Sequence, residues 1–374
     1  MAERRLRVAF LLPSIPAGPG GGTRVVFEYA NRLVARGHEV LLAMPRRPAG
    51  AGGARSWVRQ LGAGALRPAL GPDARWQRLD ARVEPLRIPS LQPRFIPRAD
   101  ALIATSWPTA EALHAASPRV GQGFYLIQGY ETWSGPASRV EATWRLPFPK
   151  IVVAGWLLEL GRRLGARDLH CITNAVDHTA FRLVRPIDLR PKCVAMMVSH
   201  QALKGSKDGI AALELARREH PDLEVVLFGK LPICRHPRWM DYRWNPPLSA
   251  LVGEVYNRSR IFVCPSWEEG FGLPGAEAMS CGCALVSTDC LGVREYASHG
   301  VTALLSPPKD VVALARNLVF LLRNDLARQR FAAAGAAALA SFDWEERVER
   351  FEELLLARCR PWGGNSDVGL ARRG

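Results

Sequence analysis

The sequence predicts an α/β protein in which two doubly wound parallel-sheet domains face a central cleft. The chain has 374 residues, enough for two or three domains with separate cores. Short apolar runs rich in Val, Ile and Leu alternate with amphipathic helical patterns along the whole chain, which is typical of strand–helix–strand units. Each half also opens with an apolar strand and a glycine turn, so the halves look like two copies of one architecture.

The expected strands form two series, one in each half of the chain. The first series comprises 7–12, 39–44, 85–88, 101–105, 124–127 and 151–154, and the second comprises 194–199, 223–229, 260–265, 284–288 and 303–305. Residues 174–192 lie between the series, lack a regular period and contain two prolines, so we expect an interdomain linker there. Residues 48–73, dense in Gly, Ala and Arg, predict a long loop or a frayed helix.

Composition excludes several classes of protein. Hydrophobic residues make up 48% and charged residues 23% of the chain, which excludes a mainly disordered protein. No apolar run approaches the roughly 20 residues that span a bilayer. The charged start leads into a glycine-rich loop instead of a cleavage site, so we expect a cytoplasmic protein. The eight cysteines lack metal-binding spacing, which predicts reduced thiols and no zinc site.

The positive charge is distributed unevenly. The net charge is +15, and residues 1–190 hold 27 basic and 14 acidic residues, a balance of +13, whereas residues 191–374 hold 23 and 21, a balance of +2. Such asymmetry indicates an anionic partner, which is a nucleic acid, a membrane surface or an acidic substrate. A compositional bias toward arginine is the alternative.

A glycine-rich loop precedes the first expected helix, which covers residues 23–36. The loop reads Pro16-Ala-Gly-Pro-Gly-Gly-Gly-Thr-Arg24. Glycines before a helix N-terminus let a ligand approach the backbone amides and the positive end of the helix dipole. Thr23 occupies the last glycine position of the G-x-G-x-x-G pattern, so NAD binding is not expected. A flexible turn without a ligand is the alternative.

The most informative stretch is residues 265–289. It offers one carboxylate, Glu269, then a loop with two glycines, then a second carboxylate, Glu277, about one turn into a short helix that Gly282 caps. The loop amides are those of Gly270, Phe271, Gly272 and Leu273. Carboxylates accept paired hydrogen bonds from vicinal hydroxyls, and amides at a helix N-terminus suit phosphate. Hydroxyls, diphosphate and further hydroxyls describe a sugar nucleotide; two carboxylates at an ordinary helix start are the alternative.

These motifs resemble glycosyltransferase family 4, whose members have the two-lobed GT-B fold. The resemblance rests on the Glu-x7-Glu element, the Glu-Gly-Phe-Gly-Leu-Pro run, the N-terminal glycine loop, and Asn174-Ala-Val-Asp177 with Phe181. Further matching segments are Leu227–Lys230, Gly292–Glu295 and Ser341–Trp344. The resemblance implies a retaining, metal-independent transfer from a nucleotide-diphosphate sugar to a hydroxyl of a glycan, lipid-linked or small-molecule acceptor, with no cofactor.

The resemblance also implies roles for individual residues. Glu269 would hold hydroxyls of the donor sugar, and Glu277 would hold the ribose. The amides of Gly270, Phe271 and Gly272 would face the diphosphate, which Lys204 would neutralise. Glu269 and Lys204 are therefore the expected catalytic residues. Leu273, Lys207 and Gly229 complete the expected donor site.

The acceptor side is expected to involve the first domain. Gly21, Gly22 and Arg24 would line the cleft there. Gln128 and Glu131 follow an expected strand and would contact a substrate, with solvated loop residues as the alternative. Trp107 would stack on a sugar ring, with a core tryptophan as the alternative.

Two features depart from the family pattern. Members carry an arginine five or six residues before the Lys-Gly lysine, where this sequence has Ser199 and Val198, so Lys207 is expected to replace it. The family histidine after strand 101–105 is also absent from the run Ala-Thr-Ser-Trp-Pro-Thr-Ala at 104–110. This pattern resembles the branch that includes bacterial rhamnosyl- and other polysaccharide-assembling transferases.

We expect a first domain over residues 1–180, a second over 181–345, and a C-terminal helix within 346–374 followed by a flexible tail. In the resembling family this helix crosses back to the first lobe. Its apolar face contains Val348 and Phe351, and its acidic face would meet the basic lobe or remain solvated.

An anionic or lipid-linked acceptor and peripheral contact with an anionic inner membrane would explain the basic first half. The rival hypotheses are a noncatalytic basic protein that binds nucleic acid or membrane, and a GT-B epimerase or phosphorylase. No nucleic-acid-binding signature is present in the sequence, so nucleic acid is not the expected partner.

Overall fold

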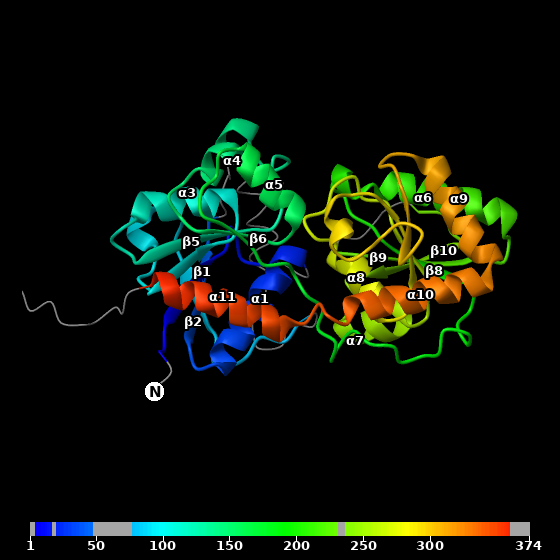
Figure 1. Ribbon diagram of the computed structural model, residues 1–374, viewed down its shortest axis with the longest axis horizontal. Coiled ribbons are helices and arrows are strands. Elements are labelled where there is room, and N and C mark those ends of the chain that lie inside the picture. The colour runs from blue at the N-terminus through cyan, green and yellow to red at the C-terminus, as the bar shows by residue number, and fades with distance from the viewer. Residues whose placement is uncertain (1–3, 17–19, 48–76, 231–235, 360–374) are drawn as a thin grey trace, which may run out of the picture.

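The computed structural model describes residues 4–16, 20–47, 77–230 and 236–359, and two α/β domains lie side by side in it (Figure 1). The first domain contains a seven-stranded sheet in the order β3-β2-β1-β4-β5-β6-β7. The second contains a six-stranded sheet in the order β10-β9-β8-β11-β12-β13. All the strand pairs of both sheets are parallel. The predicted fold class of two doubly wound sheets is therefore confirmed.

The first domain alternates strands with helices as the apolar pattern predicts. Its strands are β1 (Arg7–Leu11), β2 (Glu39–Pro45), β3 (Glu84–Ile88), β4 (Ala101–Ala104), β5 (Gln122–Ile127), β6 (Lys150–Val152) and β7 (Leu169–Cys171). Its helices are α1 (Gly21–Ala35), α3 (Trp107–Ala116), α4 (Ala137–Trp144) and α5 (Gly155–Arg163), with a short 3₁₀ turn at Pro93–Phe95. The loop or frayed helix expected at 48–73 falls outside the described residues.

The second domain repeats this alternation. Its strands are β8 (Cys193–Met197), β9 (Glu224–Gly229), β10 (Met240–Trp244), β11 (Ile261–Cys264), β12 (Ala284–Thr288) and β13 (Ala303–Ser306). Its helices are α6 (Ser206–Glu219), α7 (Leu248–Ala250), α8 (Leu273–Ser280), α9 (Val311–Arg323) and α10 (Asp325–Leu339). It also has 3₁₀ turns at Ala202–Lys204 and Gly292–Glu295 and a π-helical segment at Leu251–Tyr256. The central strands are buried, which explains their nearly continuous apolar sequences.

The linker has the irregular structure expected of it. Residues 174–192 form no helix or strand. Arg190, which is 1% exposed, fixes this segment to the second domain by donating hydrogen bonds to the carbonyl oxygens of Ser259 and Cys281 at 2.8 and 2.6 Å. The linker is therefore anchored rather than free.

The last described helix, α11 (Trp344–Arg358), lies against the first domain although it follows the second in sequence (Figure 1). The Phe351 ring stacks on Tyr29 of α1, with centroids 4.2 Å apart. The acidic face of α11 meets basic side chains of the first domain: Arg36 reaches Glu352 at 2.9 Å, and Arg32 reaches Glu345 at 3.1 Å. Part of the positive charge of the first domain is thus neutralised within the fold.

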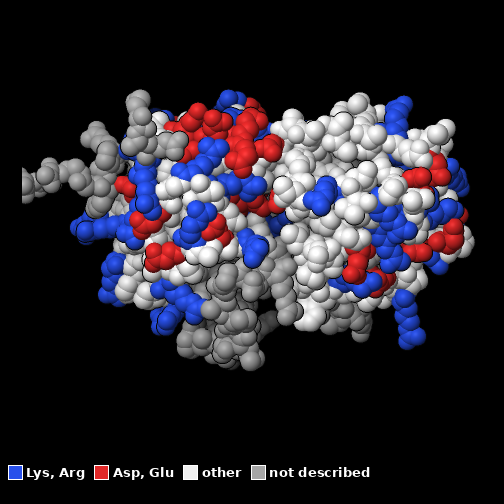
Figure 2. Space-filling view, turned by 90° about the horizontal axis from the view of Figure 1, so that it is seen from below, with Lys and Arg blue, Asp and Glu red and all other residues white. Residues whose placement is uncertain are grey.

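On the face shown in Figure 2, charged side chains are distributed differently over the two domains. Figure 2 shows basic and acidic side chains interspersed over the first domain, while a broad part of the second domain carries neither.

Among the described residues, no helix is both long enough and apolar enough to cross a membrane.

Candidate functional site

The candidate site lies where the carboxyl ends of the two sheets meet. In parallel sheets, ligands bind in the crevice beyond the carboxyl ends of the strands. Here the start of α1, the loop after β5 and the start of α5 in the first domain contact the segments that follow β11 and β12 in the second. Gly21 and Gln128 from the expected acceptor side are therefore brought beside Leu273 and Gly270 from the expected donor side.

The first carboxylate of the donor stretch, Glu269, is 8% exposed and is held on both oxygens. Lys204 Nζ lies 2.7 Å from Glu269 Oε2, and the Ser266 hydroxyl donates to Oε1 at 2.8 Å. Burial lowers the pKa of Lys204, but the adjacent Glu269 carboxylate outweighs burial, so the pKa is raised overall. The two expected catalytic residues thus form one charged pair, in which Glu269 is buried and Lys204 is half-buried.

The turn that carries Lys204 can be formed only with glycine after it. Gly205 has a φ of 58°, in the left-handed region, and a β-carbon there would lie 2.0 Å from the carbonyl oxygen of Pro265. The Lys-Gly turn after β8 therefore packs directly on the end of β11. This packing sets the distance between Lys204 and the donor loop.

The donor loop has a defined backbone shape. Gly272 has a φ of 91° and precedes the first residue of α8, Leu273. The Tyr296 hydroxyl donates to the Gly272 carbonyl oxygen at 2.7 Å, and Gly292 packs so closely that a β-carbon on it would lie 2.5 Å from the Gly270 carbonyl oxygen. Phe271 is buried against Tyr296, with ring centroids 5.3 Å apart. The loop amides are thus held at the start of a helix, an arrangement that suits an anion.

The second carboxylate, Glu277, is 2% exposed and bonded on both oxygens. Arg24 Nη1, from α1 of the first domain, lies 2.6 Å from Oε1, and the Tyr256 hydroxyl donates to Oε2 at 3.1 Å. Burial raises the pKa of Glu277, which Arg24 partly opposes. Arg24 was expected on the acceptor side, and the structure places it on the expected ribose residue.

The first turn of α1, with Gly21 and Gly22, and Gln128 form the first-domain side of the junction. Gln128 Nε2 donates to the Gly22 carbonyl oxygen at 3.1 Å. A β-carbon on Gly21 would lie 3.9 Å from the side chain of Leu273, so α1 begins beside α8. Gln128 is half-buried at the junction between the domains, which differs from the alternative of a solvated loop residue.

Glu131 caps a neighbouring helix. It has a φ of 59°, and its Oε2 accepts a hydrogen bond of 2.8 Å from the Trp107 backbone N–H at the start of α3. Burial raises the pKa of Glu131 to about 7. This geometry gives Glu131 a role in holding the loop after β5.

Trp107 takes the position of a core tryptophan. It is 5% exposed, its Nε1 donates to the Ser134 hydroxyl at 2.9 Å, and the Arg139 guanidinium lies over its ring at 5.0 Å. Its ring face is therefore not open to a sugar in this conformation. Trp133, on the same loop as Glu131, is 57% exposed.

The two remaining expected donor residues lie after β8 and β9. Lys207 is exposed in the first turn of α6. Gly229 ends β9 and is buried, and a β-carbon on it would lie 2.6 Å from the Val198 carbonyl oxygen. Gly229 therefore serves close packing between neighbouring strands.

Sequence reasoning missed two interdomain contacts. Trp156 Nε1 donates to the Gly270 carbonyl oxygen at 3.0 Å, and Glu295 Oε1 accepts from the Gly155 N–H at 2.7 Å, at the start of α5. Both first-domain residues directly follow β6, at the carboxyl edge of the sheet. Their position after a buried strand was the available signal.

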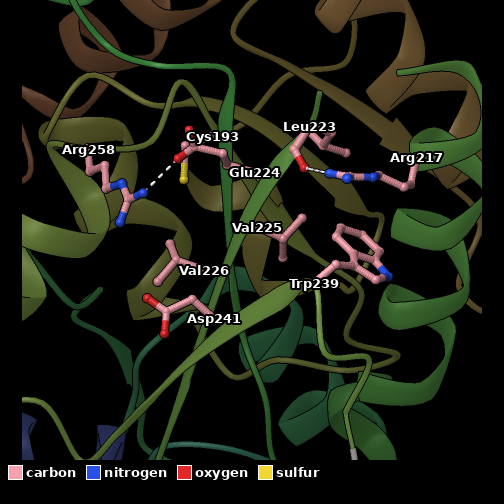
Figure 3. A pocket seen from close by; sticks show the side chains of 9 residues that line it. All are labelled: Cys193, Arg217, Leu223, Glu224, Val225, Val226, Trp239, Asp241 and Arg258. Carbon is pink, nitrogen blue, oxygen red and sulfur yellow. Dashed lines mark hydrogen bonds and ion pairs between the residues drawn. The ribbon is translucent and has the colours of Figure 1, made fainter. Parts of the chain in front are cut away.

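A separate cavity of about 200 Å³ lies at the opposite, amino-terminal edge of the second sheet (Figure 3). Its charged groups are partnered: Arg258 reaches Glu224 at 2.6 Å, and Asp241 accepts from Arg243 at 2.9 Å. The described residues contain no group of three or more His, Cys, Asp or Glu side chains arranged to hold a metal ion. The interdomain junction is therefore the candidate site.

Known proteins resemble part of this chain in sequence. Residues 192–324 match the family described as Glycosyl transferases group 1. Glycogen synthase of Mycobacterium tuberculosis is 32% identical over 171 residues, covering 42% of this chain and 40% of that protein. Phosphatidyl-myo-inositol mannosyltransferase of the same species is 40% identical over 192 residues, covering 46% and 50%. The chain thus spans half or less of the length of these relatives.

Solved structures resemble almost the whole chain. Sucrose-phosphate synthase from Thermosynechococcus elongatus superposes with a TM-score of 0.73 at 17% identity, covering 94% of this chain and 98% of that one. Anabaena Alr3699/HepE, solved in complex with UDP-glucose, gives 0.72 at 16% identity, covering 94% and 100%. These likenesses show the GT-B fold that the sequence motifs implied.

Proposed function

We propose that this chain, whose second domain belongs to the Glycosyl transferases group 1 family, transfers a sugar from a nucleotide-diphosphate sugar to a hydroxyl acceptor. The observation that carries the proposal is the Lys204–Glu269 ion pair beside a glycine loop that opens α8, at the carboxyl ends of both sheets. A cation and loop amides beside two carboxylates suit a diphosphate flanked by hydroxyl groups.

The donor would bind with its diphosphate against the amides of Gly270 to Leu273 and the Lys204 ammonium group. Glu269 would accept hydrogen bonds from the sugar hydroxyls, and Glu277 would accept them from the ribose. As the bond between the anomeric carbon and the phosphate oxygen breaks, its electron pair goes to the leaving phosphate. Lys204 and the amides are fixed before the reaction, so they stabilise that charge without reorganisation.

In this proposal the acceptor oxygen attacks the face from which the diphosphate leaves. The new bond joins the acceptor oxygen to the anomeric carbon, and the acceptor proton goes to a phosphate oxygen, so the configuration is retained. Lys204 supplies positive charge at the leaving group, which supports a transfer without a metal. Gln128 is the first-domain residue proposed to meet the acceptor, because its backbone lies against Gly270 of the donor loop.

The acceptor is proposed to be anionic or lipid-linked. The first half of the sequence carries a net charge of +13, and α11 neutralises only part of it, through residues such as Glu345 and Glu352. Transfer to a lipid-linked diphosphate in anionic vesicles should fall steeply between 50 and 300 mM salt, because surface electrostatics are screened. If transfer to a neutral soluble acceptor does not depend on salt, the positive charge is instead explained by a compositional bias of the sequence.

The function is tested by measuring thermal stabilisation and nucleotide release with UDP-, GDP- and dTDP-sugars. We expect one nucleotide class to raise the melting temperature and one of its sugars to be turned over. If no sugar nucleotide binds or is turned over, but the protein shifts RNA in a salt-sensitive manner, the noncatalytic hypothesis replaces this one.

A further inference from the structure

The expected ribose residue is occupied by the protein itself. Both Glu277 oxygens have partners, Arg24 at 2.6 Å and Tyr256 at 3.1 Å, and the carboxylate is 2% exposed. Arg24 belongs to the first domain and Glu277 to the second. The ion pair therefore exists only while the two domains are together.

The space around this pair cannot hold a ribose. The cavity beside it measures about 10 Å³, roughly the volume needed for one water molecule. Its walls come from both domains and the linker, including Glu28, Asp177 and Phe181. The guanidinium also lies over the Phe181 ring at 5.0 Å. A nucleoside can reach Glu277 only if the domains separate here or Arg24 moves.

We propose that Arg24 and the donor ribose compete for Glu277, so that the Arg24–Glu277 ion pair closes the ribose subsite until a donor displaces it. This inference rests on the role proposed above for Glu277. In the exchange, ribose hydroxyl groups replace the guanidinium N–H groups as hydrogen-bond donors to the carboxylate. No covalent bond changes.

The displaced guanidinium has other acceptors close by. Glu28 lies one helical turn after Arg24 on α1, and Asp177 lines the same cavity. The Arg24 Nε atom is buried without a hydrogen-bond partner, so the pair with Glu277 leaves Arg24 incompletely satisfied. Because a buried charge requires a partner, these two carboxylates make release of Glu277 feasible.

Competition has a specific consequence for affinity. When only a fraction of the molecules has a free binding residue, the apparent dissociation constant rises by the inverse of that fraction. Removing the competitor should therefore tighten nucleotide binding. An arginine that contacted the nucleotide would have the opposite effect, because its loss would weaken binding.

The test is calorimetric titration of the full chain with UDP, and with GDP and dTDP if UDP does not bind. Arg24→Gln is expected to lower the dissociation constant about tenfold, and Glu277→Gln is expected to raise it. In the Glu277→Gln background, Arg24→Gln should have no further effect. Arg36→Gln is the matched control, because Arg36 follows the last residue of α1 and pairs with Glu352 on α11, outside the cleft. It should change the dissociation constant less than twofold.

The outcomes separate this inference from the proposed function. If Arg24→Gln binds the nucleotide as the wild type does or more weakly, and Glu277→Gln also binds it more weakly, the competition is overturned. The donor site then stays in place. Nucleotide affinity that Glu277→Gln does not alter overturns the ribose role itself. If Arg24→Gln does not fold, Arg24→Met serves instead: it removes the charge and keeps an unbranched side chain, so binding tighter than wild type supports competition, and equal or weaker binding contradicts it.

Discussion

The backbone of Gln128 lies directly against Gly270, across the boundary between the domains. A β-carbon on Gly270 would lie 1.9 Å from the Gln128 carbonyl oxygen, closer than any real contact permits. The donor loop therefore needs glycine at this position because the first domain packs against it. This requirement adds to the expected contact of the Gly270 amide with the diphosphate. This contact joins the loop after β5 to the loop after β11.

Replacing Gly270 by alanine should hold the two domains apart. The new methyl group collides with backbone atoms, which cannot move aside as a flexible side chain would. We expect turnover to fall at least about a hundredfold, since a displacement of about 1 Å can have such an effect, with a larger radius of gyration in small-angle scattering. Gly129→Ala, at a neighbouring glycine with no atom within 4 Å of the β-carbon position, is the control. Equal activity of the two variants would contradict the close approach.

Glu269→Ala should abolish transfer far more than it weakens nucleotide binding. The substitution removes the carboxylate that holds Lys204 and that is expected to hold the donor sugar. Loss of a preorganised charged group of this kind lowers kcat by about a hundredfold to a thousandfold. Initial rates and calorimetry check the split. Glu254→Ala, at an exposed carboxylate paired with Arg243, should keep the wild-type rate; a wild-type rate in Glu269→Ala would refute the assignment.

Chelation of metal ions should leave turnover unchanged. In the proposed mechanism Lys204 and the loop amides stabilise the leaving diphosphate. Initial rates with and without 5 mM EDTA, followed by addition of Mg²⁺ or Mn²⁺, are the measurement. A rate that EDTA removes and a metal restores would show that Lys204 does not suffice.

The pH dependence of stability should contain a contribution from Glu131. Burial raises its pKa to about 7, above the ordinary value of 4.5, so the folded protein binds a proton that the unfolded chain has released. This stabilisation is fully present below pH 4.5 and is lost as the pH rises through about 7. The shift corresponds to roughly 3 kcal/mol at most. Between pH 5 and pH 8, the free energy of unfolding measured in urea should fall more for the wild type than for Glu131→Gln. An equal fall in both proteins would contradict the raised pKa.

Phe351→Ala should destabilise the whole chain by about 3 to 5 kcal/mol. Phe351 is fully buried between Tyr29 and the sheet, where Phe10 stacks at 6.3 Å, and truncation leaves a cavity in a packed core. Phe320→Ala, at a phenylalanine that is 45% exposed, should cost less than about 1 kcal/mol. Chemical denaturation of both variants tests whether α11 is part of the first domain's core.

The parts of the fold that the sequence predicted well are the buried ones. Runs such as Val8 to Leu11 and Ile261 to Cys264 are apolar because both faces of a central parallel strand are covered. Two of the four edge strands, β7 and β10, were missed. Their sequences, Leu-His-Cys and Met-Asp-Tyr-Arg-Trp, contain polar residues that an edge strand can expose to solvent.

Sequence reasoning could propose the part of the candidate site that lies in one segment. It missed the contacts that residues of the two domains form with each other. Glu269 and Glu277 stand eight residues apart in one strand–loop–helix unit, so their spacing was visible in the sequence. The pairing of Arg24 with Glu277 joins residues 253 positions apart, and no local pattern indicates it. The same is true of the bond from Trp156 to Gly270.

Because α11 returns to the first domain, the chain crosses between the domains twice, once through the linker at 174–192 and once just before Trp344. At the second crossing, the Val176 N–H donates to the Phe342 carbonyl oxygen at 3.0 Å, so the two crossings lie side by side. Two adjacent connections resist twisting and sliding more than they resist bending. The lobes should therefore open by rotation about a single axis beside these crossings, and each contact across the cleft should break in an order set by its distance from that axis.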